Sequence, residues 1–153
     1  MAAAEQTQDL AWLLQHTAHR LRGAADRIAL DHGLSGGFRD YALLMVLELQ
    51  KPQTQVELGL HVGLDKTTLT ATLDRMEAAG LVERKLNPAN RRVRTPVTTA
   101  KGRKLLNAVT AARRASEEVP GMKASELKTL RELLQKLDTA CEAAGMNSPG
   151  SCV

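Results

Sequence analysis

Three arginines lie in one short polar stretch, NPANRRVRTPVTT at residues 87–99, between two apolar runs. The guanidinium group of arginine keeps its charge and presents five N–H donors in a fixed fork, which suits phosphate oxygens. The window 84–104 has eight basic residues and no acidic residue, a net charge of +8. The other residues, with 13 basic and 17 acidic side chains, carry −4. One concentrated basic segment on an acidic body is typical of a polyanion-binding protein.

Other reactive residue types form weaker patterns. The sequence has no nucleophile elbow, phosphate-binding glycine loop or zinc-protease motif, so we expect no enzyme and no cofactor. His16 and His19 have a spacing compatible with zinc on a helix, but no third ligand stands near them, so no metal site is predicted. Two cysteines, Cys141 and Cys152, are too few for a disulfide framework and favour the reducing cytoplasm.

The residues before the basic stretch have a helix-turn-helix pattern. Thr54 and Glu57 fit a capping box that begins a short helix, which Gly63 ends. Asp65 is suited to the N-cap of a second helix, which ends near Gly80. Its apolar face has Leu69, Leu73 and Met76. The tight link between the two predicted helices indicates a helix-turn-helix.

Two short strands follow at 81–86 and 93–97, joined by a loop rich in Asn and Pro. Pro96 restricts the second strand to the edge of a sheet, because proline has no N–H to donate. A hairpin directly after a helix-turn-helix is a wing. The basic stretch is therefore predicted to be the tip and return strand of a wing.

Long helices flank this lobe, and their apolar residues fall at steps of three and four. The expected helices are 6–31 and 38–49 before the lobe, and 99–118 and a last helix after Ser125 behind it. We expect a dimer seam, although a stripe packed within one subunit is the alternative. The seam residues are Leu10, Leu14, Leu127, Leu130, Leu134, Leu137 and Cys141. Within the helix at 99–118, Leu105, Val109 and Ala112 are expected to face inward.

These elements predict a mainly α fold with a small β-wing: a winged helix-turn-helix lobe plus N- and C-terminal dimerisation helices. We expect one domain over 1–153, with dimerisation and scaffold helices at 6–50 and 99–144. The winged lobe would span 52–98, after a break at Lys51-Pro52, and a flexible tail would span 145–153. No stretch approaches the roughly 20 apolar residues that cross a bilayer, and the N-terminus lacks a signal-peptide pattern.

A helix of this kind fits the major groove of double-stranded DNA, and a wing lies beside the adjacent minor groove. Threonines and lysine at the start of the second helix can bind bases or phosphates, although they could also be ordinary exposed residues. Arg91 and Arg92 are the expected wing tip, and Arg94 lies nearer the phosphates. The predicted DNA-binding residues are Thr54, Gln55, Lys66, Thr67, Thr68, Thr70, Ala71, Arg75, Arg91, Arg92 and Arg94.

The stretch VELGLHVGLDKTTLTATLDRMEAAGLVERKLNPANRRVRTPVTTAKG resembles the MarR family of bacterial winged-helix regulators, and the likeness covers about 6–144. The resemblance implies a homodimer whose two lobes straddle a pseudo-palindromic operator. It also implies repression of transcription that a small phenolic or anionic effector relieves. Asn90 stands where the family commonly has an aspartate that orders the wing, and Ala71 where a longer polar residue often reads the groove. Thr98 replaces the usual leucine, and Gly59 replaces a common alanine and should weaken its helix slightly.

An effector site between the dimer helices and the lobe is the family's arrangement, and His16, Arg20, Tyr41 and Met45 could line it here. The alternative is that Tyr41 and Met45 belong to the core and that His16 is a surface residue. The function predicted first is a cytoplasmic, ligand-released dimeric repressor. A winged-helix DNA binder without its own ligand and a protein-association module are the alternatives.

Overall fold

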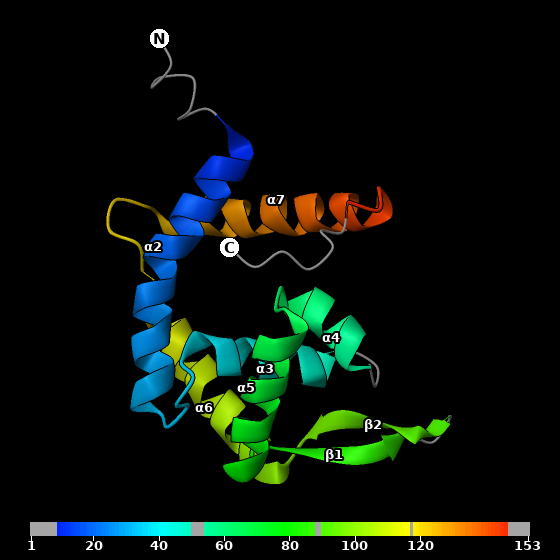
Figure 1. Ribbon diagram of the computed structural model, residues 1–153. Coiled ribbons are helices and arrows are strands. Elements are labelled where there is room, and N and C mark those ends of the chain that lie inside the picture. Colours follow the sequence, from blue (N-terminus) through cyan, green and yellow to red (C-terminus); the bar gives the residue numbers. More distant parts are fainter. Residues whose placement is uncertain (1–8, 50–53, 88–89, 117, 147–153) are drawn as a thin grey trace.

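The computed structural model describes residues 9–49, 54–87, 90–116 and 118–146. It is mainly helical with one two-stranded antiparallel sheet, which confirms the predicted fold class (Figure 1). The predicted break at Lys51-Pro52, the wing loop at 88–89 and the tail beyond residue 146 lie outside the described residues. The elements are α2 (Leu10–Asp31), α3 (Phe38–Leu49), α4 (Gln55–Val62), α5 (Lys66–Ala78), β1 (Val82–Asn87), β2 (Asn90–Thr98), α6 (Ala100–Ala115) and α7 (Ala124–Ala143).

Two predicted helix starts and one predicted helix end are confirmed by their caps. Glu57 N–H donates to the Thr54 hydroxyl at 3.3 Å, and Thr54 N–H donates to the Glu57 carboxylate at 2.7 Å, which completes the capping box of α4. Asp65 accepts from Thr68 N–H at 2.9 Å and begins α5. Gly63, with φ of 67°, adopts the left-handed conformation that ends α4, so the turn between the two helices is tight.

The core of the lobe lies between α3, α4, α5 and α6. The predicted apolar face of α5 is confirmed: its three residues are buried with Leu43, Leu44 and Leu58. The predicted inward face of α6 is confirmed at Val109, which is buried, and at Leu105, which is half-buried and packs against the core; the prediction missed Leu106, which is buried. This helix ends at Ala115 rather than near 118. At this end the hydroxyl of Ser116 donates to the backbone carbonyl of Ala112.

The helix α6 packs against the base of the sheet through Gly102. A Cβ atom at this position would lie 2.2 Å from the carbonyl oxygen of Leu81 and 2.8 Å from Cγ2 of Thr98. The N–H of the same glycine donates to the hydroxyl of Thr99, the N-cap of the helix, at 3.0 Å. Glycine is therefore required here for a close approach of helix and sheet.

The strands β1 and β2 pair from Val82–Thr98 at the base to Asn87–Asn90 at the tip, with an irregularity after Leu86. Pro96 lies opposite Arg84. A two-stranded sheet has only edge strands, which is the setting that the proline requires.

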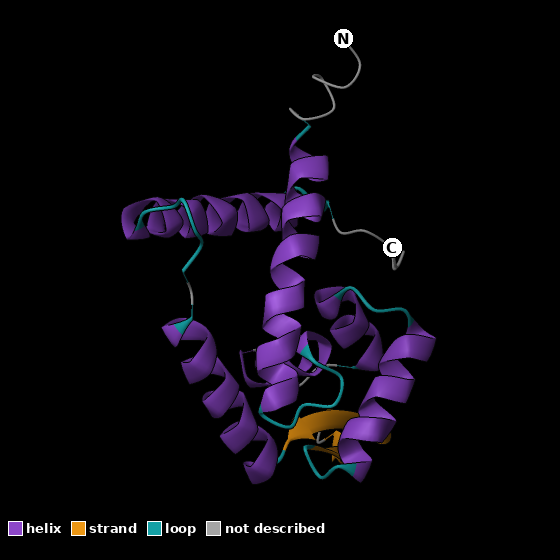
Figure 2. Cartoon of the chain, turned by 90° about the vertical axis from the view of Figure 1, so that its left-hand side faces the viewer, coloured by secondary structure: helices purple, strands orange, loops and turns teal. Residues whose placement is uncertain are grey.

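The helices α2 and α7 extend away from the lobe (Figures 1 and 2). In α2 only Ala25 and Ala29, near its C-terminal end, are buried, and α7 has no buried residue. Within the described chain the stripe on α7 is therefore at most half-buried, and the dimer seam stays a prediction. None of the described helices is both long enough and apolar enough to cross a membrane.

Candidate nucleic-acid interface

The first turns of α5 present a polar surface. Lys66, Thr67 and Ala71 are exposed. The hydroxyl of Thr68 donates to Asp65 at 2.6 Å, and that of Thr70 donates to the carbonyl of Lys66 at 2.8 Å. Of the predicted threonines on α5, Thr67 alone makes no hydrogen bond within the described residues through its side chain, so its hydroxyl is free to bind a ligand.

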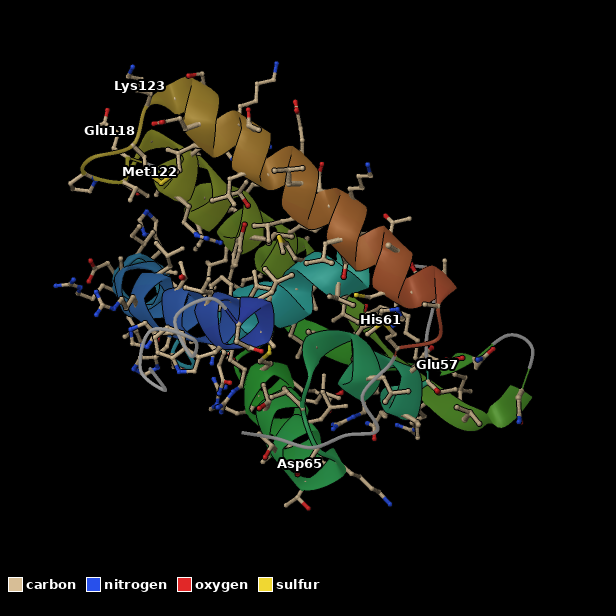
Figure 3. The ribbon with its side chains drawn as sticks, turned by 90° about the horizontal axis from the view of Figure 1, so that it is seen from above. Glu57, His61, Asp65, Glu118, Met122 and Lys123 are labelled. Atoms are coloured by element: carbon tan, nitrogen blue, oxygen red, sulfur yellow. The ribbon has the colours of Figure 1, made fainter. Side chains whose placement is uncertain are left out.

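In the view of Figure 3, Asp65, the N-cap of α5, lies on the opposite side of the molecule from Glu118, Met122 and Lys123. The unpaired N–H groups of a helix N-terminus attract anions. The start of α5 is therefore a suitable place for an anionic partner.

Thr54 and Gln55, at the start of α4, are half-buried. The hydroxyl of Thr54 is engaged by Glu57, to which it also donates a hydrogen bond of 2.9 Å. Hydrogen bonds from the backbone and then the side chain of Thr54 lower the pKa of Glu57. The local role of Thr54 is thus to cap α4, and a DNA contact from either residue stays a prediction.

Arg75 has a partner that the sequence did not indicate. Its guanidinium donates to both carboxylate oxygens of Asp40 in α3, at 2.6 and 2.7 Å, and to the hydroxyl of Ser35 at 2.8 Å. The hydrogen bonds that Arg75 donates to Asp40 raise the pKa of Arg75. The guanidinium expected to contact DNA is therefore held by the scaffold, and its DNA contact stays a prediction.

The basic window is less positively charged than its composition indicates. Arg84 pairs with Asp74 and Glu77 of α5, Lys85 with Glu83, and Arg103 with Glu48. The acidic partners of these basic residues lie outside the window 84–104 in the sequence, so the net charge of +8 does not include them. The side chain of Arg94 is exposed, opposite Leu86.

Arg91 and Arg92 lie in β2 directly after its first residue, Asn90. This places their backbone at the outer end of the sheet, as the wing prediction requires. Their side chains lie outside the part of the chain that the structure describes.

Of the four predicted effector-site residues, Tyr41 and Met45 border one groove of the subunit and His16 borders another, so a site that all four share stays a prediction. Tyr41 and Met45 border a groove of about 700 Å³ between α3, α6 and α7. His16 borders a separate groove on α2, where its ring stacks on Trp12 and accepts a hydrogen bond of 3.1 Å from Arg20. The two grooves are separate because only the C-terminal end of α2 packs against the lobe, and His16 lies in the part of α2 that extends away from it.

The groove between α3, α6 and α7 combines aromatic and cationic side chains. The guanidinium of Arg113 lies 4.8 Å from the ring centre of Tyr41 and 5.0 Å from that of Phe38. Thr110 donates to the hydroxyl of Tyr41 at 3.4 Å, and Arg114 and Arg131 also line the groove. Sequence reasoning missed these arginines, although Arg113-Arg114 is a visible pair near the end of α6.

The predicted seam residues lie on the two helices that extend from the lobe. Leu10, Leu130 and Leu134 are exposed, at 57%, 40% and 39%, whereas Leu14, Leu127, Leu137 and Cys141 are half-buried. Within the described residues, no group of three or more His, Cys, Asp or Glu side chains could hold a metal ion.

Comparison with known proteins agrees with this geometry. The family model of the MarR family matches residues 39–93. A MarR-family transcriptional regulator from Rhodococcus sp. RHA1 is 26% identical, covering 85% of this chain and 95% of that chain, with a TM-score of 0.71. CouR from Rhodococcus jostii RHA1, solved bound to p-coumaroyl-CoA, is 26% identical, covering 86% and 92%, with a TM-score of 0.65. A MarR-family transcriptional regulator from Streptomyces coelicolor is 25% identical, covering 85% and 91%, with a TM-score of 0.68. The chain thus matches the MarR family model over residues 39–93, and over most of its length its winged helix-turn-helix fold is similar to that of MarR-family transcriptional regulators.

Proposed function

We propose that the protein is a homodimeric repressor that binds a pseudo-palindromic site in double-stranded DNA and is released by a small anionic effector. The observation that carries the proposal is the exposed polar start of α5, at Lys66 and Thr67, on the same lobe as the basic wing. The helix α5, here called the recognition helix, would enter the major groove with this end. The wing would place Arg91, Arg92 and Arg94 at the adjacent minor groove and its phosphates.

Dimer formation is supported by the two helices that the lobe leaves uncovered. The apolar face of α7 has no partner within the described chain that buries it, and leucines of the outer half of α2 are exposed. Exposed apolar faces of this length are typical of protein–protein interfaces. A second copy of the chain would cover both helices and place two recognition helices on one DNA duplex.

An effector site is supported by the groove of about 700 Å³ at Tyr41, Met45 and Arg113. Stacked aromatic and guanidinium groups, with two further arginines nearby, favour an anion that carries an aromatic ring. CouR, which resembles this chain, was solved bound to p-coumaroyl-CoA, an anionic thioester of this kind. His16 and Arg20 would contribute only from another part of the dimer.

A gel-shift assay tests the DNA-binding proposal. The purified protein is mixed with DNA from upstream of its own gene, at two salt concentrations and with unrelated competitor DNA. We expect a complex that survives competitor and weakens steeply with salt, since phosphate contacts release counterions. Binding that competitor abolishes would indicate a nonspecific DNA binder, and salt-insensitive or absent binding would favour the protein-association alternative. A complex that p-coumaroyl-CoA and simple aromatic acids leave intact would count against release by the proposed effector class.

A further inference from the structure

Arg84 joins the wing to the recognition helix at a defined point. Its guanidinium donates to Asp74 at 2.5 Å and also to Glu77, and its backbone N–H donates to Glu77 at 3.1 Å. The side chain is only 16% exposed. The next two residues of β1, Lys85 and Leu86, are exposed. Arg84, the third residue of β1, therefore connects the wing to the recognition helix through both its side chain and its backbone N–H.

The charges around Arg84 are the reverse of what DNA attraction alone favours. Asp74 and Glu77 are partly exposed carboxylates on the helix that would enter the groove, and a carboxylate near phosphates weakens DNA binding. Burial acts to lower the pKa of Arg84, but its hydrogen bonds to Asp74 and Glu77 outweigh burial and raise it. The guanidinium of Arg84 is thus bound by Asp74 and Glu77 instead of being free to contact DNA. The presence of these two acids on α5 therefore needs an explanation other than attraction to DNA.

The inner half of the wing is also held by the lobe. Val82 of β1 and Thr95 and Pro96 of β2 are buried, and β2 contacts α3. Thr95 lies opposite Lys85, so these contacts reach as far along the hairpin as Arg84 does. The three-residue link from Arg84 to Asp74 and Glu77 adds a direct connection between β1 and α5, which restrains the wing relative to the recognition helix itself.

We propose that Arg84 is a positioning residue that fixes the angle between the recognition helix and the wing, so that both fit one DNA site at once. The proposal rests on the proposed function, because it assigns to Arg84 an effect on DNA specificity without a DNA contact. Groups that orient contact residues affect affinity through geometry, although they do not touch the ligand.

A purely electrostatic effect of Asp74 and Glu77 and the positioning role predict opposite changes in DNA affinity when the two acids are neutralised. In the double variant Asp74→Asn/Glu77→Gln, simple electrostatics predicts stronger DNA binding, since two negative charges are removed. The positioning role predicts specific binding at least tenfold weaker, with the affinity for competitor DNA unchanged or higher. Glu83→Gln is the matched control, because it removes a carboxylate of the wing that pairs with Lys85 instead of Arg84.

Variants of Arg84 complete a mutant cycle with the Asp74→Asn/Glu77→Gln double variant. Arg84→Gln should weaken specific binding to the same extent as the double variant, and the triple variant should be no weaker, because all three remove one linkage. DNA binding by Arg84→Gln should retain the salt dependence of the wild type. Loss of a phosphate contact would instead reduce the slope of log affinity against log salt concentration by about one. Arg84→Lys should be intermediate, since one ammonium cannot match the fork that joins two carboxylates. Tighter binding by the double variant, or additive losses, would overturn the proposal.

Amide hydrogen exchange on the DNA-free protein keeps this test independent of the proposed function. In Arg84→Gln we expect at least tenfold faster exchange of the β1 and β2 amides, with the α6 amides unchanged. If the wing exchanges as slowly as in the wild type, the positioning role is refuted whatever the DNA assays show. If the wild type binds no DNA while the wing is loosened, the proposed function fails and the attachment itself stands.

Discussion

Arg75 of the recognition helix forms a two-pronged ion pair with Asp40 of α3, whose side chain is fully buried. The N–H of Gly36 also donates to this carboxylate, at 2.8 Å. A Cβ atom on Gly36 would lie 2.2 Å from the carboxylate, so glycine leaves room for the pair. The scaffold and the helix proposed to read DNA are thus joined by one buried charge.

Removal of Arg75 should destabilise the fold. In Arg75→Gln, Asp40 would be left buried without its cation, and we expect a loss of about 3 kcal/mol, the lower end for such a change because Arg75 is partly exposed. Urea unfolding followed by circular dichroism measures this loss. Arg39→Gln, which alters an exposed arginine on the same lobe, should change stability by less than about 0.5 kcal/mol. Equal stability of the two variants would show that the ion pair contributes nothing.

Two glycines within helices should respond to alanine with opposite signs. Gly23→Ala in α2 should stabilise the protein by about 0.5–1 kcal/mol, because nothing lies within 4 Å of the added Cβ. Gly102→Ala should destabilise it by about 1–3 kcal/mol, because the Cβ would collide with the backbone of Leu81. Thermal unfolding of both variants provides the comparison. Stabilisation by Gly102→Ala would mean that α6 can move away from the sheet without cost.

Arg92→Ala should weaken DNA binding by roughly tenfold, the effect of about 1–3 kcal/mol expected for a good DNA-contacting arginine. Its melting temperature should stay close to that of the wild type. Gel shifts at fixed salt give the affinity, and Lys128→Ala on α7 controls for the loss of one positive charge elsewhere. Unchanged affinity of Arg92→Ala would remove the wing from the proposed interface.

Leu134→Glu should dissociate the dimer, because a charge would replace an apolar side chain at the proposed seam on α7. Gln135→Glu adds the same charge one residue further along, off the apolar stripe, and should leave the dimer intact. Sedimentation equilibrium distinguishes the two outcomes. A full dimer in both variants would show that the seam lies elsewhere.

The capping box of α4 should respond to acid. The hydrogen bonds of Thr54 lower the pKa of Glu57 in the folded protein, so their contribution is present above the unfolded pKa and is lost as pH falls through the folded pKa. Thr54→Ala should raise the pKa of Glu57 part of the way back, since the backbone N–H at position 54 remains. A carboxyl-detected NMR titration measures both pKa values. An identical pKa in the variant would show that the hydroxyl has no influence on Glu57.

Local features of the fold could be predicted from the sequence. The caps at Thr54, Asp65 and Thr99 depend on side chains and N–H groups three residues apart, so a short pattern contains both partners. The buried face of α5 follows from the helical repeat alone. The phase of α6 was harder, because Leu105 and Leu106 are adjacent and either could begin the apolar face.

The ion pairs and the groove could not be predicted in the same way. Asp40 and Arg75 are 35 residues apart, and Arg84 binds two acids on a different element. The sequence contained one indication, Asp40 directly before the apolar run at 41–47, where an ionised side chain that becomes buried needs a partner. Which cation pairs with it depends on how α3 packs against α5, and this is a property of the tertiary structure.

The two-stranded wing also bears on aggregation. Both of its strands are edges, and an edge with unpaired N–H and C=O groups can recruit strands from other molecules. The wing carries features that oppose this: Lys85 and Arg94 are exposed charges, Pro96 lacks an N–H, and the ladder is irregular after Leu86. The charged residues that would attract a polyanion to the wing thus also oppose edge-to-edge association of free molecules.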